Sequence, residues 1–387
     1  MNRRSFILKS STALGIGVAS KVCEPVFSKM NRVYASTVND KSSTKDTPSL
    51  EYRVLGKTGL KVSAVGYGAM RTTDPAVVHR ALDLGINFID TAHGYQDGNN
   101  EIMIGNVMKQ RRDEAYVCTK IPHADKKRMT EMFETSLKRL QMDTVDILHY
   151  HSVKTIDRLH NEEAMALLTK WKKQGKTRFI GFSTHTNEAE LLEQAAKDKF
   201  WDVILVAYNF KKSPELTKAI EAVAKAGIGV VAMKTQAGGY KDSQMGSWSP
   251  HQAALKWVLQ NPHVHAAIPS MTTFEELEED VQVMGKKMGW HDRKVLDRYG
   301  QIIDPLYCRA CNSCVLTCPH GVDIPEINRC LMYAEGYGDL ALARMNYAEL
   351  STDQNVSHCI GCEKCVAKCV HGLNIARKME NAHRMFS

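Results

Sequence analysis

Four side chains with acid–base chemistry stand where three successive apolar runs of the sequence end. Asp90 closes the run that begins at Phe88, and Tyr95 follows it five residues later. Lys120 closes a second apolar run, and His151 closes a third, which reads VDILHYH. If these runs are parallel strands lying side by side, the four side chains meet at one end of a sheet.

An acid, a phenol, an amine and an imidazole grouped in this way suit proton transfer to a carbonyl oxygen. A free tyrosine has a pKa of about 10 and is a poor acid at neutral pH. We expect a lysine cation beside the phenol to lower that pKa, and an aspartate to hold the lysine charged and in place. A histidine would then hydrogen-bond the substrate oxygen and orient it.

A second chemical signal is the concentration of cysteines near the C-terminus. Nine of the eleven cysteines follow residue 307. Eight of them form two runs with the spacing C-x2-C-x2-C-x3-C, namely Cys308, Cys311, Cys314 and Cys318, then Cys359, Cys362, Cys365 and Cys369. This is the ligand run of bacterial ferredoxins, so two [4Fe–4S] clusters are predicted. Zinc sites and disulfides are the alternatives, and Cys118 and Cys330 are interpreted as packing residues.

The elements that must position the acid–base side chains alternate between strand and helix patterns. Residues Glu51–Val62 predict a short hairpin around two glycines. Helix-like segments then separate the strands, for example with Ala189, Leu192 and Ala196 at helical spacing. Strand patterns fall near residues 63–69, 87–91, 115–120, 145–151, 178–184, 203–209, 229–235 and 265–270. Eight β/α repeats predict an α/β fold, a parallel (β/α)8 TIM barrel with its chemistry at the C-terminal strand ends.

With this pattern the chain resembles the aldo/keto reductases over roughly residues 50–290. The resemblance implies that Asp90, Tyr95, Lys120 and His151 form a catalytic tetrad, with Tyr95 as general acid and base. The opening hairpin is expected to plug the opposite end of the barrel. The resemblance also implies an NAD(P)(H) site at the later strand ends, formed by Ser183, Thr184, Tyr208, Asn209, Lys234, Gly238, Ser270 and Glu276.

Several positions depart from the nucleotide site of that family. Thr184 stands where an asparagine usually occurs, and Leu205 where a glutamine binds the carboxamide. Ser270 and Glu276 stand where relatives place a lysine and an arginine for the adenosine 2′-phosphate. An acid there repels a phosphate, so NADH is favoured over NADPH.

The tail, residues 291–387, resembles the helical two-cluster ferredoxin domain of membrane-quinone and disulfide reductase subunits. Helix-like stretches lie between Cys318 and Cys359. In two-cluster domains the fourth cysteine of each run ligates the other cluster. The resemblance therefore implies that Cys369 completes the first site and Cys318 the second, in a small, mainly α-helical domain.

The N-terminal segment resembles a twin-arginine export signal. Arg3 and Arg4 are followed by a weakly apolar stretch over residues 10–19. We expect residues 1–35 to be the signal and residues 36–49 a linker, which places the protein in the periplasm or an equivalent compartment; a basic disordered start is the alternative. Contact with a membrane is expected only if the signal stays uncleaved as an anchor.

The net charge of +8 does not indicate nucleic-acid binding. Residues 1–35 hold six basic side chains and one acid, which leaves +3 for the rest. Two thiolate-bound clusters would add about −2 each and bring that remainder to roughly −1. The expected partners are a small carbonyl or alcohol substrate and an electron-transfer protein, with no nucleic acid.

Other polar and aromatic residues follow the strand ends. His93, His123 and His185 could ligate a metal, but we interpret them as hydrogen-bond donors lining the pocket. The loop over residues 238–249 contains Tyr240 and Trp248. It is either a lid that stacks on a sugar ring or other flat ligand, or an ordinary loop anchored by two aromatic side chains.

The sequence thus predicts an exported oxidoreductase that interconverts an aldehyde or ketone, such as a sugar-derived one, and an alcohol. A nicotinamide moves two electrons as hydride whereas a cluster moves one, so the electron route stays open. In one hypothesis a nucleotide is tightly bound and the clusters are structural. A second passes substrate electrons through the clusters to a partner. A third makes the protein an electron-transfer or binding module without barrel chemistry.

Overall fold

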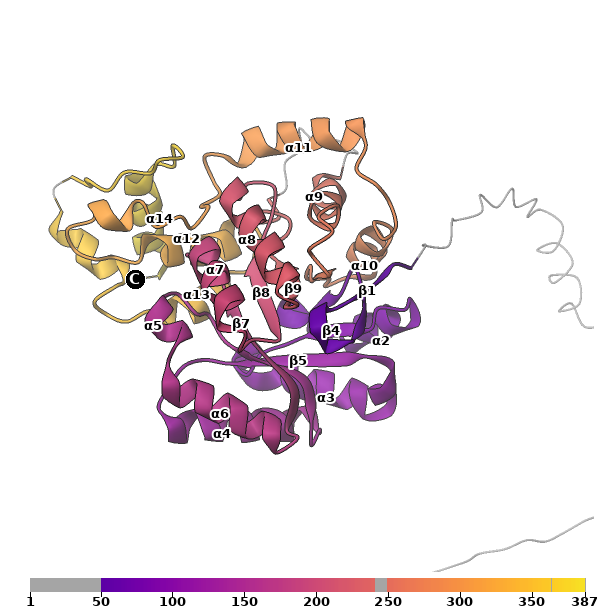
Figure 1. The fold of residues 1–387 in the computed structure, drawn as a ribbon. Coiled ribbons are helices and arrows are strands. Elements are labelled where there is room, and N and C mark those ends of the chain that lie inside the picture. Colours follow the sequence, from indigo (N-terminus) through magenta and orange to yellow (C-terminus); the bar gives the residue numbers. More distant parts are fainter. Residues whose placement is uncertain (1–49, 241–248, 363, 387) are drawn as a thin grey trace, which may run out of the picture. The chain divides into compact units, whose positions relative to one another are not determined.

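The eight-stranded sheet curls into a parallel barrel in the computed structural model, which describes residues 50–240, 249–362 and 364–386 (Figure 1). Neighbouring strands are parallel, and an isolated parallel bridge joins Val65, just before the first barrel strand, to Ala267 in the last one. This confirms the predicted (β/α)8 architecture. The strands, in chain order, are β3 (Tyr67–Gly68), β4 (Phe88–Asp90), β5 (Tyr116–Ile121), β6 (Val145–Tyr150), β7 (Thr177–Thr184), β8 (Val203–Ala207), β9 (Gly229–Met233) and β10 (Ala266–Ala267).

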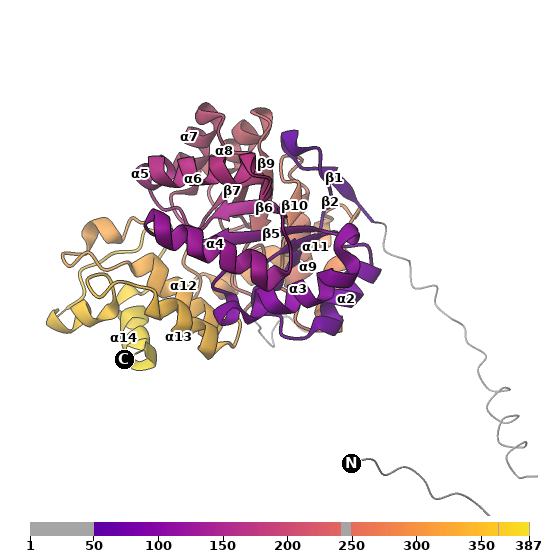
Figure 2. The ribbon, with the colours of Figure 1, turned by 90° about the horizontal axis from the view of Figure 1, so that it is seen from below.

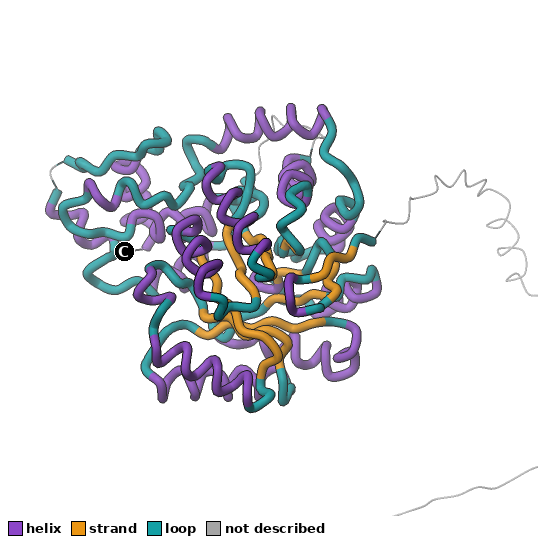
Figure 3. Tube along the Cα trace, in the orientation of Figure 1, coloured by secondary structure: helices purple, strands orange, loops and turns teal. Residues whose placement is uncertain are grey.

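Helices enclose the strands (Figure 3), and most of them bury mainly apolar side chains. In α4, for example, Met129, Phe133 and Leu140 are buried at helical spacing, and the Asp125 side chain caps the first turn. The helices are α2 (Pro75–Asp83), α3 (Asn99–Arg111), α4 (Lys126–Leu140), α5 (Ile156–Leu159), α6 (Glu162–Lys173), α7 (Glu188–Asp198), α8 (Pro214–Lys225), α9 (Pro250–Leu259) and α10 (Phe274–Val281).

The N-terminal hairpin closes the bottom of the barrel. Its strands, β1 (Tyr52–Val54) and β2 (Lys61–Ser63), pair antiparallel. Leu55, Leu60 and Val62 pack in one buried cluster with inward-facing strand residues such as Phe88 and Ile147. The predicted plug is therefore present, and the opposite, C-terminal strand ends are the face where chemistry is expected.

The tail packs against the barrel, and residues 48–387 form one compact unit. Its helices are α11 (Trp290–Ile303), α12 (Ile324–Glu335), α13 (Leu340–Ala348) and α14 (Ile375–Phe386). Figures 1 and 2 show α12, α13 and α14 side by side. Tyr299 of α11 and Tyr333 of α12 share a buried cluster with Ala253 and Ala254 of barrel helix α9. Among the described residues, no helix is both long and apolar enough to span a bilayer.

Candidate active site

Three of the four tetrad side chains are joined by hydrogen bonds at the strand ends. The Lys120 Nζ lies 2.5 Å from the Asp90 Oδ2 and 3.2 Å from the Tyr95 hydroxyl. It also donates to the Thr91 carbonyl oxygen at 2.7 Å. His151 lies edge-on to the Tyr95 ring, with 6.3 Å between ring centroids. The structure thus brings together the acid, phenol, amine and imidazole that the sequence placed at three strand ends.

The turn that carries Tyr95 has an unusual backbone. Gln96 and Asp97 directly after it have φ values of 52° and 54°, in the left-handed region. The Gln96 side chain donates to the carbonyl oxygens of Met70 and Thr72, which holds this turn against the loop after β3. Such strain in non-glycine residues concentrates at functional sites. Gln96 is a positioning residue that the sequence did not reveal.

Burial sets the protonation state of Tyr95. It raises the pKa of the phenol above its usual value, and Lys120 opposes this rise without reversing it. Lys120 does lower the pKa of Tyr95, as expected, but desolvation outweighs this effect and the net shift is upward. Burial alone would lower the pKa of Lys120, but Asp90 and Tyr95 raise it above its usual value. Tyr95 is thus a protonated phenol held beside a charged ammonium.

His151 is neutral in this surrounding. Burial and then Lys120 lower the pKa of His151 well below its usual value. A neutral imidazole donates one ring N–H without bringing a charge into the site. His151 therefore suits hydrogen bonding to a substrate oxygen rather than proton delivery.

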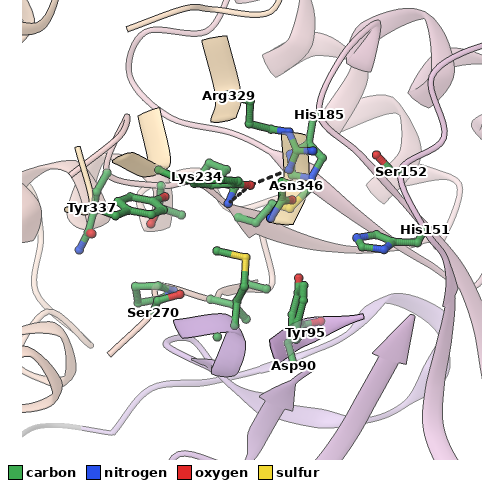
Figure 4. A pocket seen from close by; sticks show the side chains of 18 of the residues that line it. Asp90, Tyr95, His151, Ser152, His185, Lys234, Ser270, Arg329, Tyr337 and Asn346 are labelled. Atoms are coloured by element: carbon green, nitrogen blue, oxygen red, sulfur yellow. Dashed lines mark hydrogen bonds between the residues drawn. The ribbon is translucent and has the colours of Figure 1, made fainter. Parts of the chain in front are cut away.

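A cavity of about 120 Å³ opens beside the tetrad, and Asp90, Tyr95 and His151 line it together with Lys234 (Figure 4). We call it the catalytic pocket. Further barrel residues complete part of the lining, and the tail supplies another part of the wall through Arg329, Tyr333, Tyr337, Asn346 and Glu349. Nothing in the local sequence of the tail indicated which barrel surface it covers, so these five residues were missed.

Two of the eight residues implied for nucleotide binding, Lys234 and Ser270, line the catalytic pocket. Ser183 and Thr184 are buried; the Ser183 hydroxyl accepts from the Ser152 N–H at 2.9 Å, and the Thr184 hydroxyl donates to the Thr186 carbonyl at 2.7 Å. Tyr208 packs on Trp257, with 5.0 Å between ring centroids.

The tail covers the remaining part of that strand-end surface. The Asn209 amide donates to the Tyr307 hydroxyl at 2.8 Å, and the Lys234 ammonium donates to the Tyr333 hydroxyl at 3.1 Å. A Cβ added to Gly238 would meet Met332 of α12 at 3.1 Å. Glu276 accepts from the Thr272 N–H and hydroxyl, both at 2.8 Å.

These contacts test whether the surface fits a dinucleotide. The catalytic pocket of about 120 Å³ is smaller than the roughly 300–1,000 Å³ of ordinary ligand pockets. Asn209, Lys234 and Gly238 contact the tail instead of an open groove. With the tail in this position the catalytic pocket alone is too small for a whole dinucleotide, although Ser270 and Glu276 line an adjoining cavity of about 80 Å³.

The cysteines gather in two sets, each with one member from the other run. Burial, followed by the nearby Cys311 and Cys369, raises the pKa of Cys314 to about 11. Cys308 lies in the same set, because Cys314 and Cys311 contribute to its raised pKa of about 12, after burial.

In the second set, burial, Cys318, Cys365 and Cys362 raise the pKa of Cys359 to about 11. These four cysteines line a cavity of about 380 Å³. Thiols that raise one another's pKa need a cation to be held as thiolates, and iron supplies it. Both sets therefore fit [4Fe–4S] clusters.

A single metal ion is a different case. No three His, Cys, Asp or Glu side chains in the described part of the chain are grouped as ligands of one ion. This is compatible with clusters, whose thiolates stand farther apart than those around one ion. Cys118 and Cys330 are both fully buried, as packing residues are.

Of the three histidines past strand ends, His185 lines the catalytic pocket. His93 is 3.1 Å from the Ser136 hydroxyl, and His123 is 2.5 Å from the Tyr150 hydroxyl. The expectation that all three line the pocket is therefore wrong for His93 and His123. Tyr240 is buried and donates to the Leu306 carbonyl at 3.2 Å, so it anchors its loop to the tail. Trp248 lies outside the described residues.

Comparisons with known proteins agree with this division. The Aldo/keto reductase family matches residues 64–246, and the 4Fe-4S dicluster domain matches residues 301–370. The L-galactose dehydrogenase of Arabidopsis thaliana is 29% identical over 307 residues, which cover 66% of this chain and 95% of that protein. The methylglyoxal reductase DkgB of Escherichia coli O157:H7 is 29% identical over 267 residues, 64% of this chain and 97% of that protein.

Solved structures share the barrel fold. The aldo-keto reductase AKR11C1 from Bacillus halodurans matches with a TM-score of 0.55 and 22% identity, covering 65% of this chain and 96% of that one. An aldo-keto reductase from Klebsiella pneumoniae in complex with NADPH matches with a TM-score of 0.56 and 24% identity, covering 65% and 95%.

Proposed function

We propose that this oxidoreductase interconverts a small carbonyl compound and its alcohol, with Tyr95 transferring the proton. The proposal starts from an aldo/keto reductase domain over residues 64–246 and a 4Fe-4S dicluster domain over residues 301–370. One observation carries the proposal. The buried Lys120 ammonium is 3.2 Å from the Tyr95 hydroxyl and 2.5 Å from Asp90, and Tyr95 and Asp90 line a small pocket.

In the reducing direction, the protonated Tyr95 donates its proton to the carbonyl oxygen as the carbon is reduced. The charged Lys120 stabilises the phenolate that forms, and Asp90 keeps that ammonium in place. His151 donates a hydrogen bond to the same oxygen and orients it. In the oxidising direction each role reverses, and the Tyr95 phenolate accepts the hydroxyl proton.

The cysteine sets support two clusters, one held by Cys308, Cys311, Cys314 and Cys369, the other by Cys318, Cys359, Cys362 and Cys365. When bound, each cluster takes or gives one electron, so the pair matches the two electrons of one alcohol–carbonyl conversion. The role of the protein is to hold these thiolates and to keep the cysteines near the catalytic pocket.

A cluster-linked electron route is favoured over an exchangeable nicotinamide. The tail contacts that engage Asn209, Lys234 and Gly238 support it, as does the lining shared by two neighbouring cavities. His185, Lys234 and Arg329 line both the catalytic pocket and a cavity of about 40 Å³ that reaches Cys308. An NADH-dependent enzyme remains the competing version, and it requires the tail to move away.

Export by the twin-arginine route belongs to the same proposal. Arg3 and Arg4 support it, as does the need to insert clusters before the protein leaves the cytoplasm. An electron-transfer partner in that compartment would then complete the turnover.

The deciding experiment uses full-length protein purified without oxygen. We expect about eight irons per chain, no nucleotide released on denaturation, and no fluorescence change on adding NADH or NADPH. Alcohol substrate should then bleach the cluster absorption and reduce ferricyanide. L-galactose and methylglyoxal, after which the relatives are named, are the first compounds to test. Stoichiometric NAD(H), with clusters that substrate never reduces, would reject the cluster-linked version.

A further inference from the structure

Lys234 is a cation without an acidic partner in the wall of the catalytic pocket. It follows β9 with a φ of 56°, a strained conformation for a non-glycine residue. Its ammonium donates to the Tyr333 hydroxyl at 3.1 Å and lies 4.6 Å from the centre of that ring and 5.6 Å from that of Tyr337. In the described ranges of the chain, no carboxylate lies within ion-pair distance of this ammonium.

A second cation reaches the same wall from the tail. Arg329 of α12 donates to the Tyr333 hydroxyl at 2.6 Å and pairs with Glu326. Its Nε is buried without a hydrogen-bond partner. Arg329 and Lys234 thus donate to the same hydroxyl, that of Tyr333, and both are labelled in the view of the pocket in Figure 4. Barrel and tail therefore each contribute one cation to this wall.

The charges around the pocket are unbalanced. The pKa of Lys234 lies well below its usual value, because of burial first and then of Arg329, Lys120 and Arg71. Glu326 raises this pKa, but by less. Burial and Arg329 likewise lower the pKa of His185. Asp90 is already paired with Lys120, and burial raises the pKa of the other carboxyl in the wall, Glu349.

An unpaired ammonium in a confined pocket is unfavourable unless a counterion arrives. A ligand anion would supply that counterion. The cavity of about 120 Å³ limits the ligand to a compound of a few carbon atoms. Arg329 and Lys234 both line this cavity, and two basic side chains suit the two oxygens of a carboxylate.

We propose that the substrate is a small hydroxy acid or oxo acid, whose carboxylate binds Lys234 and Arg329 while its hydroxyl or carbonyl oxygen faces Tyr95. This rests on the proposed function and adds the class of substrate. The carboxylate itself does not react.

The test compares acids with their neutral amides, which have nearly the same size. Glycolate, lactate and glycerate, each with its amide, are titrated into full-length, cluster-loaded protein by calorimetry. We expect at least one acid to bind tenfold or more tightly than its amide. In a Lys234→Met variant the ratio of acid affinity to amide affinity should fall toward one. The affinity for the amide and the iron content should stay unchanged. Lys287→Met, an exposed lysine, is the matched control.

Three results would overturn the proposal: equal affinity for every acid and its amide in the wild type, a Lys234→Met variant that keeps the preference, or displacement of the acids by micromolar ADP or inorganic phosphate. The last would assign the cations to a phosphate group. If Lys234→Met fails to fold, Lys234→Arg should keep the preference. A Tyr95→Phe variant should keep binding and lose turnover, so failure of the reaction is distinguishable from failure of acid recognition.

Discussion

Gly336, at the end of α12, lies directly against the backbone of Gly238 in the loop after β9. A Cβ placed on Gly336 would come within 2.2 Å of the Gly238 carbonyl oxygen. Contact this close leaves no room for a side chain, so two segments about a hundred residues apart in sequence meet backbone to backbone. This contact seats the helix that carries Arg329 and Tyr333 on the rim of the barrel.

Replacing Gly336 with alanine should therefore loosen the tail. The φ of −92° suits alanine, so the cost comes from the clash with Gly238 rather than from backbone strain. We expect a loss of about 1–3 kcal/mol in the free energy of unfolding, measured by urea denaturation, and a lower turnover because α12 carries part of the pocket wall. Gly289→Ala is the control, since its nearest atom would be Asp292 Oδ2 at 3.5 Å. Equal stability of the two variants would contradict the packing described.

Tyr95→Phe should remove the reaction while keeping the fold. The phenol is the only tetrad group that transfers a proton in the proposed chemistry, so we expect turnover to fall by roughly 10²–10⁴-fold. The measurement is kcat with an artificial electron acceptor, with circular dichroism to check folding. The control is Tyr52→Phe in the hairpin at the bottom of the barrel. It removes a hydroxyl that donates to the Gly85 carbonyl oxygen and should leave turnover unchanged. Full activity in Tyr95→Phe would point to the electron-transfer module without barrel chemistry.

The crossed cysteine sets predict which cluster each variant loses. Cys369 stands with the first run and Cys318 with the second. We expect Cys369→Ser and Cys318→Ser each to lower the iron content from about eight to about four per chain. Their electron paramagnetic resonance spectra should retain opposite clusters. Cys330→Ala, a fully buried cysteine outside both sets, should keep all the iron. Identical residual spectra in the two serine variants would contradict the crossed assignment.

Stability should fall as the pH drops below neutrality, partly through His93. Burial, Arg139 and Arg128 lower the pKa of His93 to about 4 from its ordinary 6.5. Between pH 6.5 and 4 this histidine is therefore protonated in the unfolded chain but neutral in the folded protein. The free energy of unfolding decreases as the pH falls through 6.5. Between pH 8 and pH 5 we expect the free energy of unfolding of His93→Gln to fall by roughly 1–2 kcal/mol less than that of the wild type. Urea unfolding between pH 5 and 8 measures this, and parallel curves would disprove the contribution.

Much of the barrel and its tetrad could be predicted from the sequence because the signals are local. Strand ends at Asp90, Lys120 and His151 follow from short apolar runs, and parallel pairing brings them together. The direction of the net shift in the Tyr95 pKa could not be predicted, because desolvation depends on all the residues packed around the phenol. Arg329 was missed for a related reason. Helical periodicity shows that α12 has a buried face, but not that this face meets a barrel built from distant residues.

The position of α12 between the two cysteine runs has a consequence for maturation. Cys318 precedes this helix and Cys359 follows α13, so the segment that carries Arg329 and Tyr333 lies between two of the proposed iron ligands. We expect a chain that has not yet received its iron to hold those two ends, and with them one wall of the catalytic pocket, less firmly. We therefore expect newly made protein to become active only after cluster assembly, and iron starvation of the cell to silence this enzyme without any change in its synthesis.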